Sequence, residues 1–144
     1  YSTAFVLCAG RNDAEVARWL ENVIHILPVN QRPEGYNPLE VKNLDAAWIE
    51  RLGRSGRDCY DAIVARDVAA LGESMNECMR CWEAILPGTV RHRTIQIDLP
   101  TLLKYYQSRY PGAMYSGCGG GYLYVISQEP VPGAFQVKVR IRPS

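Results

Sequence analysis

The residues best suited to contact a ligand form a glycine-rich run near the carboxyl end, Gly112-Ala113-Met114-Tyr115-Ser116-Gly117-Cys118-Gly119-Gly120-Gly121. Glycines let the backbone come close to a ligand and adopt positive φ angles, so consecutive amides can point at an anion. A hairpin turn needs the same residues, which leaves a purely structural role open. The run lacks the Gly-Lys-Ser/Thr ending of a Walker P-loop. A strand-like run follows it where a dinucleotide fingerprint would have a helix.

The cysteines offer a second candidate chemistry. Five cysteines are scattered along the chain without the spacing of a disulfide framework, which favours a reducing cytosol and a cytoplasmic location. Cys78 and Cys81 form a CxxC pair, a spacing found in zinc and redox sites. The two histidines, His25 and His92, do not have the spacing of zinc-finger ligands. Because the pair also lies in a helical pattern beside Trp82, we expect it to pack in a core and to hold no metal.

The elements that must position these residues begin with an apolar run over Thr3–Cys8, which predicts a buried strand. Asn12 or Asp13 is the expected cap of a following helix. The apolar face of that helix consists of Val16, Leu20, Val23 and Ile24, and the helix is expected to stop before Pro28. The proline-rich stretch from 28 to 38 predicts a loop.

Two longer helical patterns follow. The first has apolar residues at Leu44, Trp48, Leu52, Cys59, Ala62 and Ile63. Gly53 and Gly56 interrupt it, and each costs a helix interior about 1 kcal/mol, which predicts a break or close packing. The second begins at a cap, Asp67, ends at Pro87-Gly88, and carries the stripe Val68, Leu71, Met75, Cys78, Trp82 and Ile85. Asp98 and Pro100 then predict a short helix through Tyr106.

Three strand-like runs close the chain. Ala113–Cys118 and Tyr122–Ser127 flank Gly119-Gly120-Gly121 and predict a hairpin. The last run, Phe135–Arg142, alternates apolar and mostly basic residues, which predicts a half-exposed strand. Its basic face is either only solvated or in contact with phosphate or nucleic acid. Together the patterns predict an α+β domain with helices packed on one face of an antiparallel sheet.

Composition limits the classes of function. The 144 residues fit one domain, and an apolar fraction of 47% with 22% charged residues is typical of globular proteins. Sixteen basic and fifteen acidic residues give a net charge of +1, which provides no general attraction for nucleic acid or a membrane. No apolar run approaches the roughly 20 residues of a membrane span, and the first ten residues do not resemble a secretion signal. The start at Tyr1, with strand-like sequence at once, suggests a piece of a longer polypeptide, although a mature protein trimmed at its amino end would look the same.

Two segments resemble motifs of the GHMP kinases, a family that includes galactokinase and the homoserine, mevalonate and phosphomevalonate kinases. The run Gly112–Gly121, with the apolar strand after it, is similar to the family's third motif, "GAxxSGxGGG". The segment Asp67–Glu77 is similar to the family's "gD…aLGelmne" helix. The resemblance covers roughly Leu44 to Ser127 and looks closest to bacterial sugar kinases of the heptose-phosphate and fucose type.

The resemblance implies the ferredoxin-like fold of the family's carboxyl-terminal half, as one domain over residues 1–144. It implies that six residues line the substrate and phosphate site without proton chemistry; these are Ser116, Gly117, Cys118, Gly119, Gly120 and Gly121, called the glycine segment below. Further candidate contacts to a sugar or sugar phosphate are Arg11, Arg91, His92, Arg93, Tyr115 and Tyr124. Basic loops are often only solvated, and alternating aromatic residues often fill a sheet face.

The resemblance also implies a longer parent protein that transfers the γ-phosphoryl group of ATP, with Mg²⁺, to a sugar or sugar phosphate. This chain contains no "PxGxGxSS/A" nucleotide loop. Phosphoryl transfer depends on positioning the transferred group and neutralising its charge. We therefore expect the amino-terminal nucleotide-binding domain to be absent, no residue here to be catalytic, and neither ATP nor Mg²⁺ to bind tightly to this chain alone.

A second hypothesis is a stand-alone binding or dimerisation module without catalytic activity. The basic run Gln136–Arg142 would then be a partner surface. Under the kinase hypothesis the partners are a sugar or sugar phosphate and the parent's own amino-terminal kinase domain. Neither nucleic acid nor a membrane is expected as a partner, and a homodimer remains open. Similarity of fold alone does not decide between the two hypotheses.

Overall fold

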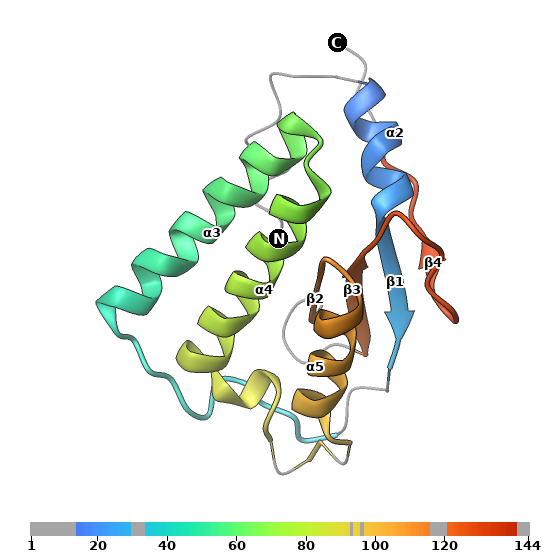
Figure 1. Cartoon of the computed structure of the whole chain (residues 1–144). Helices are drawn as coiled ribbons and strands as arrows, with labels where there is room; N and C mark the ends of the chain where they lie inside the picture. Colours follow the sequence, from blue (N-terminus) through green and yellow to red (C-terminus); the bar gives the residue numbers. More distant parts are fainter. Residues whose placement is uncertain (1–13, 30–33, 93, 96, 116–120, 141–144) are drawn as a thin grey trace.

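The computed structural model describes residues 14–29, 34–92, 94–95, 97–115 and 121–140. The strand predicted over Thr3–Cys8 lies outside these ranges. Figure 1 shows a sheet with helices packed against it, which confirms the α+β class. The elements, in chain order, are α2 (Ala14–Val23), β1 (Ile24–Pro28), α3 (Ala46–Ala65), α4 (Val68–Ile85), the 3₁₀ turn η2 (Pro87–Thr89), α5 (Leu99–Arg109), β2 (Gly112–Tyr115), β3 (Tyr122–Ile126) and β4 (Phe135–Gln136).

The sheet has the strand order β2-β3-β1-β4, and neighbouring strands are antiparallel. β3 therefore separates β1 from β2, and these two strands run parallel. The register aligns Leu27, Leu123 and Tyr115 in one row across the three strands. All three are buried in the largest core cluster, together with Leu99 and Leu103 of α5. The predicted hairpin of β2 and β3 is confirmed.

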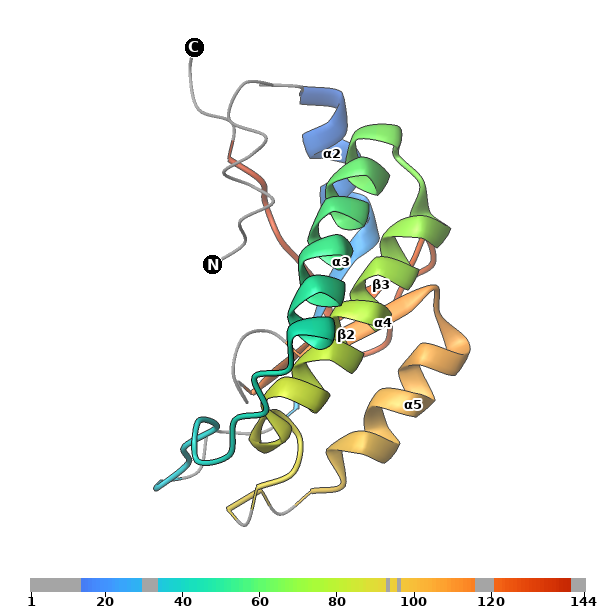
Figure 2. The ribbon, with the colours of Figure 1, turned by 90° about the vertical axis from the view of Figure 1, so that its left-hand side faces the viewer.

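Helix α4 lies between α3 on one side and the β2 edge of the sheet on the other. Figures 1 and 2 show α3 as the outer helix of this pair, with α5 apart from it beside the sheet. Because α4 has neighbours on two sides, its buried residues exceed the single stripe predicted for it. Leu71 and Ile85 of that stripe are buried, but so are Met79 and Cys81, which lie outside it.

The predicted helix caps at Asp67 and Asp98 are confirmed. The Asp67 carboxylate accepts the amide of Ala70 at 3.0 Å, and the Asp98 carboxylate accepts the amide of Thr101 at 3.2 Å. Asp45 caps α3 in the same way. Each carboxylate satisfies an amide that has no partner within its helix. The helix predicted to end at Tyr106 continues to Arg109.

The first described helix is shorter than its pattern predicted. It ends at Val23, before Pro28 as predicted, but Ile24, which was expected on the apolar face of this helix, already begins β1. Ile24 pairs with Ile126 of β3, and this ladder continues to Pro28. The helical spacing predicted the wrong element for Ile24, because its side chain packs in the same cluster as Leu20 and Val23 although its backbone belongs to the strand.

The expected break or close packing at Gly53 and Gly56 is also wrong. Helix α3 runs through both glycines without interruption. A Cβ atom on Gly56 would meet nothing within 4 Å, and one on Gly53 would meet only the end of the Arg57 side chain at 3.9 Å. Neither glycine is therefore required by packing.

The predicted strand over Phe135–Arg142 pairs with β1 only at Phe135 and Gln136. The following residues lie beside α2, because the chain before Ile24 is helical and offers no strand partner. The Val139 amide donates to the Glu21 carboxylate at 2.7 Å, and Arg18 donates to the Val139 carbonyl. The predicted alternation holds in part: Val137 and Val139 pack against the core and Lys138 is exposed, but Phe135 is exposed as well. Residues 141 and 142 lie outside the described ranges. Of the helices in the described ranges, none is long and apolar enough to cross a membrane.

Candidate functional site

The glycine segment connects two strands whose facing ends are firmly held. Ser116 to Gly120 lie outside the described residues, as do Arg11 and Arg93. On one side, Tyr115 ends β2 and is buried. On the other side, the Gly121 carbonyl accepts the amide of Val29, just after β1, at 2.6 Å. The segment therefore starts and finishes at the end of the sheet where β1 ends.

Arg91 and His92 lie at the same end of the sheet. Val90, which precedes them, packs in one cluster with Leu27, Tyr115 and Leu123. Arg91 is exposed and lies near the start of α5. Its charge helps to lower the pKa of Asp98, after the larger effects of the Thr101 hydroxyl and amide. Arg91 is thus an exposed cation at the end of the sheet where β1 ends, and it is suited to contact an anion.

His92, in contrast, is fully engaged within the protein. Its side chain is 4% exposed. The Thr94 amide donates to its Nδ1 at 3.3 Å, so Nδ1 is the acceptor and Nε2 carries the proton. Nε2 then donates to the Glu40 carboxylate at 3.0 Å, and the Thr94 hydroxyl lies 2.7 Å from Nδ1. Tyr36 packs edge-on against the ring. His92 therefore joins segment 34–45 to the loop after η2 and has no ring nitrogen left for a ligand.

The structure assigns Tyr115 to the core. It is 1% exposed, and its hydroxyl donates to the Leu99 carbonyl at 3.4 Å. Burial raises the pKa of its phenol far above the ordinary range, and the charges of Glu83 and Asp98 add to the rise. The buried ring presents no face on which a sugar could stack. Tyr124 is half-buried on the alternate face of β3.

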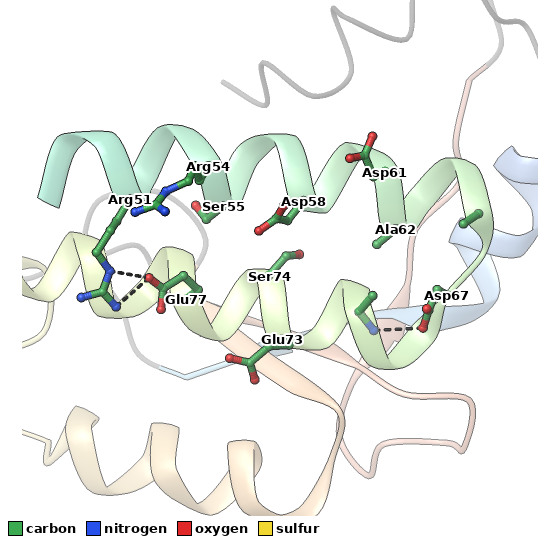
Figure 3. Close-up of a pocket in the computed structure, with 12 residues that line it drawn as sticks. Arg51, Arg54, Ser55, Asp58, Asp61, Ala62, Asp67, Glu73, Ser74 and Glu77 are labelled. Atoms are coloured by element: carbon green, nitrogen blue, oxygen red, sulfur yellow. Dashed lines mark hydrogen bonds and ion pairs between the residues drawn. The ribbon is translucent and has the colours of Figure 1, made fainter. Parts of the chain in front are cut away.

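A groove between α3 and α4 was not anticipated from the sequence. It has a volume of about 720 Å³. Its floor includes the small buried residues Ser55, Ala62 and Ser74, and both serine hydroxyls donate to carbonyls of their own helices. Figure 3 shows Ser55 and Ser74 on facing helices with Asp58 directed into the space between them. The groove is present because small side chains occupy positions at which larger side chains would otherwise interdigitate between the two helices.

The rim of the groove is charged. Its carboxylates are Asp58, Asp61, Asp67, Glu73 and Glu77, and its guanidinium groups are those of Arg51 and Arg54. Arg51 closes one end by donating to Glu77 at 2.7 Å and stacking over Trp48. Burial alone would raise the pKa of Glu77, but hydrogen bonds from Arg80 and Arg51 lower it below its ordinary value. The sequence signal for this groove was the recurrence of small and acidic residues at helical spacing on both helices.

The CxxC pair lies on α4, as predicted. Cys81 is fully buried with Ile85 and Leu86, which confirms its packing role. Cys78 is half-buried near Ser55. Burial is the main cause that raises the pKa of both thiols, so both are protonated at neutral pH and weakly nucleophilic. Within the described ranges, no three Cys, His, Asp or Glu side chains converge as metal ligands.

Comparisons with known proteins add no relative. No family model matches the chain, and no curated protein or solved structure matches it either.

Proposed function

We propose that this chain is the carboxyl-terminal domain of a GHMP-type, ATP-dependent small-molecule kinase and that it shapes one side of the substrate cleft. The observation that supports this proposal is the position of the two strand ends that the glycine segment connects. The segment joins β2 to β3 at the end of the sheet that also carries the exposed Arg91. A glycine-rich connection with a nearby cation suits contact with a phosphate group.

The topology is also compatible with the ferredoxin-like part of the proposal. β1, the helices and β2 form a split β-α-β unit with β3 inserted between the two parallel strands. The second connection departs from a regular ferredoxin-like domain, because residues 127–134 between β3 and β4 contain no helix. The proposed substrate class is a sugar or sugar phosphate, bound between this domain and an amino-terminal kinase domain.

In this proposal the chain supplies binding surface and no proton transfer. Arg91 and the backbone of the glycine segment contact the anionic part of the substrate. Tyr115 fixes the start of the segment, and His92 fixes the neighbouring loop. Within the described ranges, no three His, Cys, Asp or Glu side chains form a metal-binding group. In this proposal the longer parent protein binds the nucleotide and the metal.

The test compares two polypeptides, the 144-residue chain and the native product isolated from its source cells. The intact mass of the native product is measured first. We expect a longer chain that transfers phosphate from ATP to a member of a sugar and sugar-phosphate panel, while the 144-residue chain has no activity. A native chain of 144 residues, or ATP-dependent activity of the short chain, would contradict the proposal.

The second candidate is a stand-alone binding module, and the groove between α3 and α4 favours it. At about 720 Å³ it has the size of a small-molecule site, and it lies away from the sheet end. A native mass equal to this chain, together with metabolite binding in the absence of ATP, would support the module over the kinase domain.

A further inference from the structure

The stretch that leads into α3 exposes its large apolar side chains. Between positions 39 and 49, four aliphatic residues are 48% to 71% exposed; these are Leu39, Val41, Leu44 and Ile49, called the aliphatic patch below. One exposed aliphatic residue is ordinary on a protein surface. Four of them in one short stretch keep a continuous apolar surface in water, and a surface of this kind is typical of a contact with another protein or domain.

The polar side chains of the same stretch are bonded to the rest of the domain. Tyr36, Glu40 and Asn43 each form a hydrogen bond with a residue between Ala84 and His92. Pro38 also packs against Gly88, where an added Cβ atom would lie 3.1 Å from its backbone. Because the polar side chains are held by the domain, the aliphatic side chains remain at the surface. The patch is therefore a preformed surface.

The apolar surface continues beyond this stretch at the same end of the molecule. Ile97, which lies just before α5, is 41% exposed, and Tyr122, which pairs with Pro28 at the end of β1, is 47% exposed. Figure 1 shows segment 34–45, η2, the start of α5 and the end of β1 gathered at one end, the lower end in that view. Six of the eight large apolar residues that are exposed in the described ranges lie there. The other two, Tyr105 and Phe135, lie further along α5 and on β4.

We propose that the aliphatic patch, together with Ile97 and Tyr122, is the surface against which the amino-terminal kinase domain of the parent protein packs. The proposal rests on the proposed function for the existence of that domain. The position of Arg91 at the same end identifies the occupant. A phosphoryl-transfer site must exclude water, which would otherwise compete as the acceptor, so a substrate held at Arg91 has to be covered by the kinase domain. A second copy of this chain on the same surface would instead block access to Arg91.

The experiment measures how fast hydroxyl radicals label side chains in the 144-residue chain and in the native product from its source cells. Tyr122 and Tyr105 are a matched pair, because they are the same residue type and are 47% and 48% exposed. We expect Tyr122 and the aliphatic patch to be labelled at least about threefold more slowly in the native product, because the centre of an interface excludes water. Labelling of Tyr105 and Phe135 should be the same in both polypeptides.

A substitution tests the contact directly. Leu44 is 71% exposed, so Leu44→Ser should leave the midpoint of urea unfolding of the 144-residue chain unchanged. In the native product, the same change should raise the labelling rate of Tyr122 toward its rate in the 144-residue chain. Tyr105→Ser, the control, should have no such effect.

Equal labelling of Tyr122 in the two polypeptides would overturn the proposal. Protection that rises with the concentration of the 144-residue chain would also overturn it, because a second copy would then cover the patch. A native product that phosphorylates a sugar but leaves the patch reactive contradicts this inference alone. Protection in a longer product without phosphoryl transfer contradicts the kinase activity and supports the interface. A native chain of 144 residues contradicts both proposals.

Discussion

At the scale of single residues, Glu77 links α3 and α4, because its carboxylate accepts hydrogen bonds from an arginine on each helix. Arg51 of α3 and Arg80 of α4 donate to its two carboxylate oxygens at 2.7 and 2.8 Å. Arg80 also reaches Glu73. The Glu77 side chain is only 23% exposed, whereas Glu73 is 66% exposed, so Glu77 is the better-shielded partner. The lowered pKa of Glu77 is the titration signature of this network.

Replacing Glu77 should therefore change how stability depends on pH. Because the pKa of Glu77 is lower in the folded chain than in the unfolded one, its contribution is present above its ordinary value of 4.5 and is lost as the pH falls through the folded value. We expect Glu77→Gln to cost about 1 kcal/mol near neutral pH and to lose less stability on acidification than the parent chain. Urea unfolding at about pH 7 and about pH 3.5 measures both quantities.

Glu73→Gln is the control for this prediction, because it removes a more exposed partner of Arg80. Glu73→Gln should lower the free energy of unfolding at neutral pH by less than Glu77→Gln does. It should also have a smaller effect on the loss of stability on acidification. An equal loss of stability on acidification in Glu77→Gln and the unmodified chain would contradict the assignment.

The residue scale also shows what sequence reasoning can reach. The caps Asp67 and Asp98 were predictable, because a cap and its amide partner lie three positions apart. The partner of Asn76 lies 37 positions away, at a strand edge that exists only in the folded chain. The hydrogen bonds of Asn76 and Gln107 to the backbone of Ala113 therefore could not be derived from local patterns.

At the scale of elements, the two long helices contain glycines whose surroundings differ. Gly56 faces open space in α3, whereas Gly72 of α4 touches the backbone of β2. From the sequence alone, both are glycines inside a helix, and each is expected to destabilise its helix by the same amount. Only the packing tells them apart, since α3 is the outer helix and α4 an inner one.

The same substitution should thus stabilise one helix and damage the other. Gly56→Ala should raise the free energy of unfolding by about 0.5–1 kcal/mol, because alanine restricts the unfolded chain and meets no obstacle in the helix. Gly72→Ala should lower it by at least about 2 kcal/mol, because its methyl group displaces β2. Thermal and urea unfolding of the two variants measure the difference.

Gly53→Ala serves as an internal control, since its methyl group would meet only a flexible arginine end. It should behave like Gly56→Ala. A destabilising Gly56→Ala, or a neutral Gly72→Ala, would show that the packing of these helices differs from the structure.

The type of an element was predictable where it packs mainly against one neighbour. The predicted boundaries were wrong where two elements contribute residues to the same core cluster. The hairpin around the glycine segment and the three helices after residue 44 follow from turn residues and periodicity. The junction at Val23 and Ile24 does not, because helix and strand contribute to the same core cluster. The short pairing of β4 depends on α2, which occupies the space beside residues 137–139.

At the scale of the whole molecule, segment 34–45 ties the far end of α4 to the sheet end. The Asn43 amide and side chain donate to the carbonyls of Ile85 and Ala84, which end α4 and lack partners within the helix. Tyr36 donates to the Gly88 carbonyl at 2.9 Å. Glu40 accepts from His92, so the segment is held at three separate points.

Removing the imidazole should release this segment without unfolding the domain. In His92→Ala, Glu40 and Thr94 lose their shared partner, while the core clusters keep all their members. We expect limited proteolysis within residues 34–45 to become several-fold faster, with a loss of global stability of at most about 2 kcal/mol. With a protease that does not cleave after basic residues, Lys42→Ala, which changes an exposed residue of the same segment, should leave the cleavage rate unchanged. Cleavage spread evenly over the chain would contradict a local effect.

The class of fold was predictable from the sequence, but the strand order was not. The two central strands of the sheet, β1 and β3, come from an early and a late part of the described chain. His25 and Ser127, in contact at 3.0 Å, are 102 positions apart. A chain growing from the ribosome can form the α3–α4 hairpin early, since its contacts are local. β1 must wait, unpaired, until β3 has been synthesised and leaves the exit tunnel. Closing so long a loop is slow, so we expect the sheet to form last and the apolar β1 to be the stretch most exposed to aggregation or chaperone binding while the protein is being made.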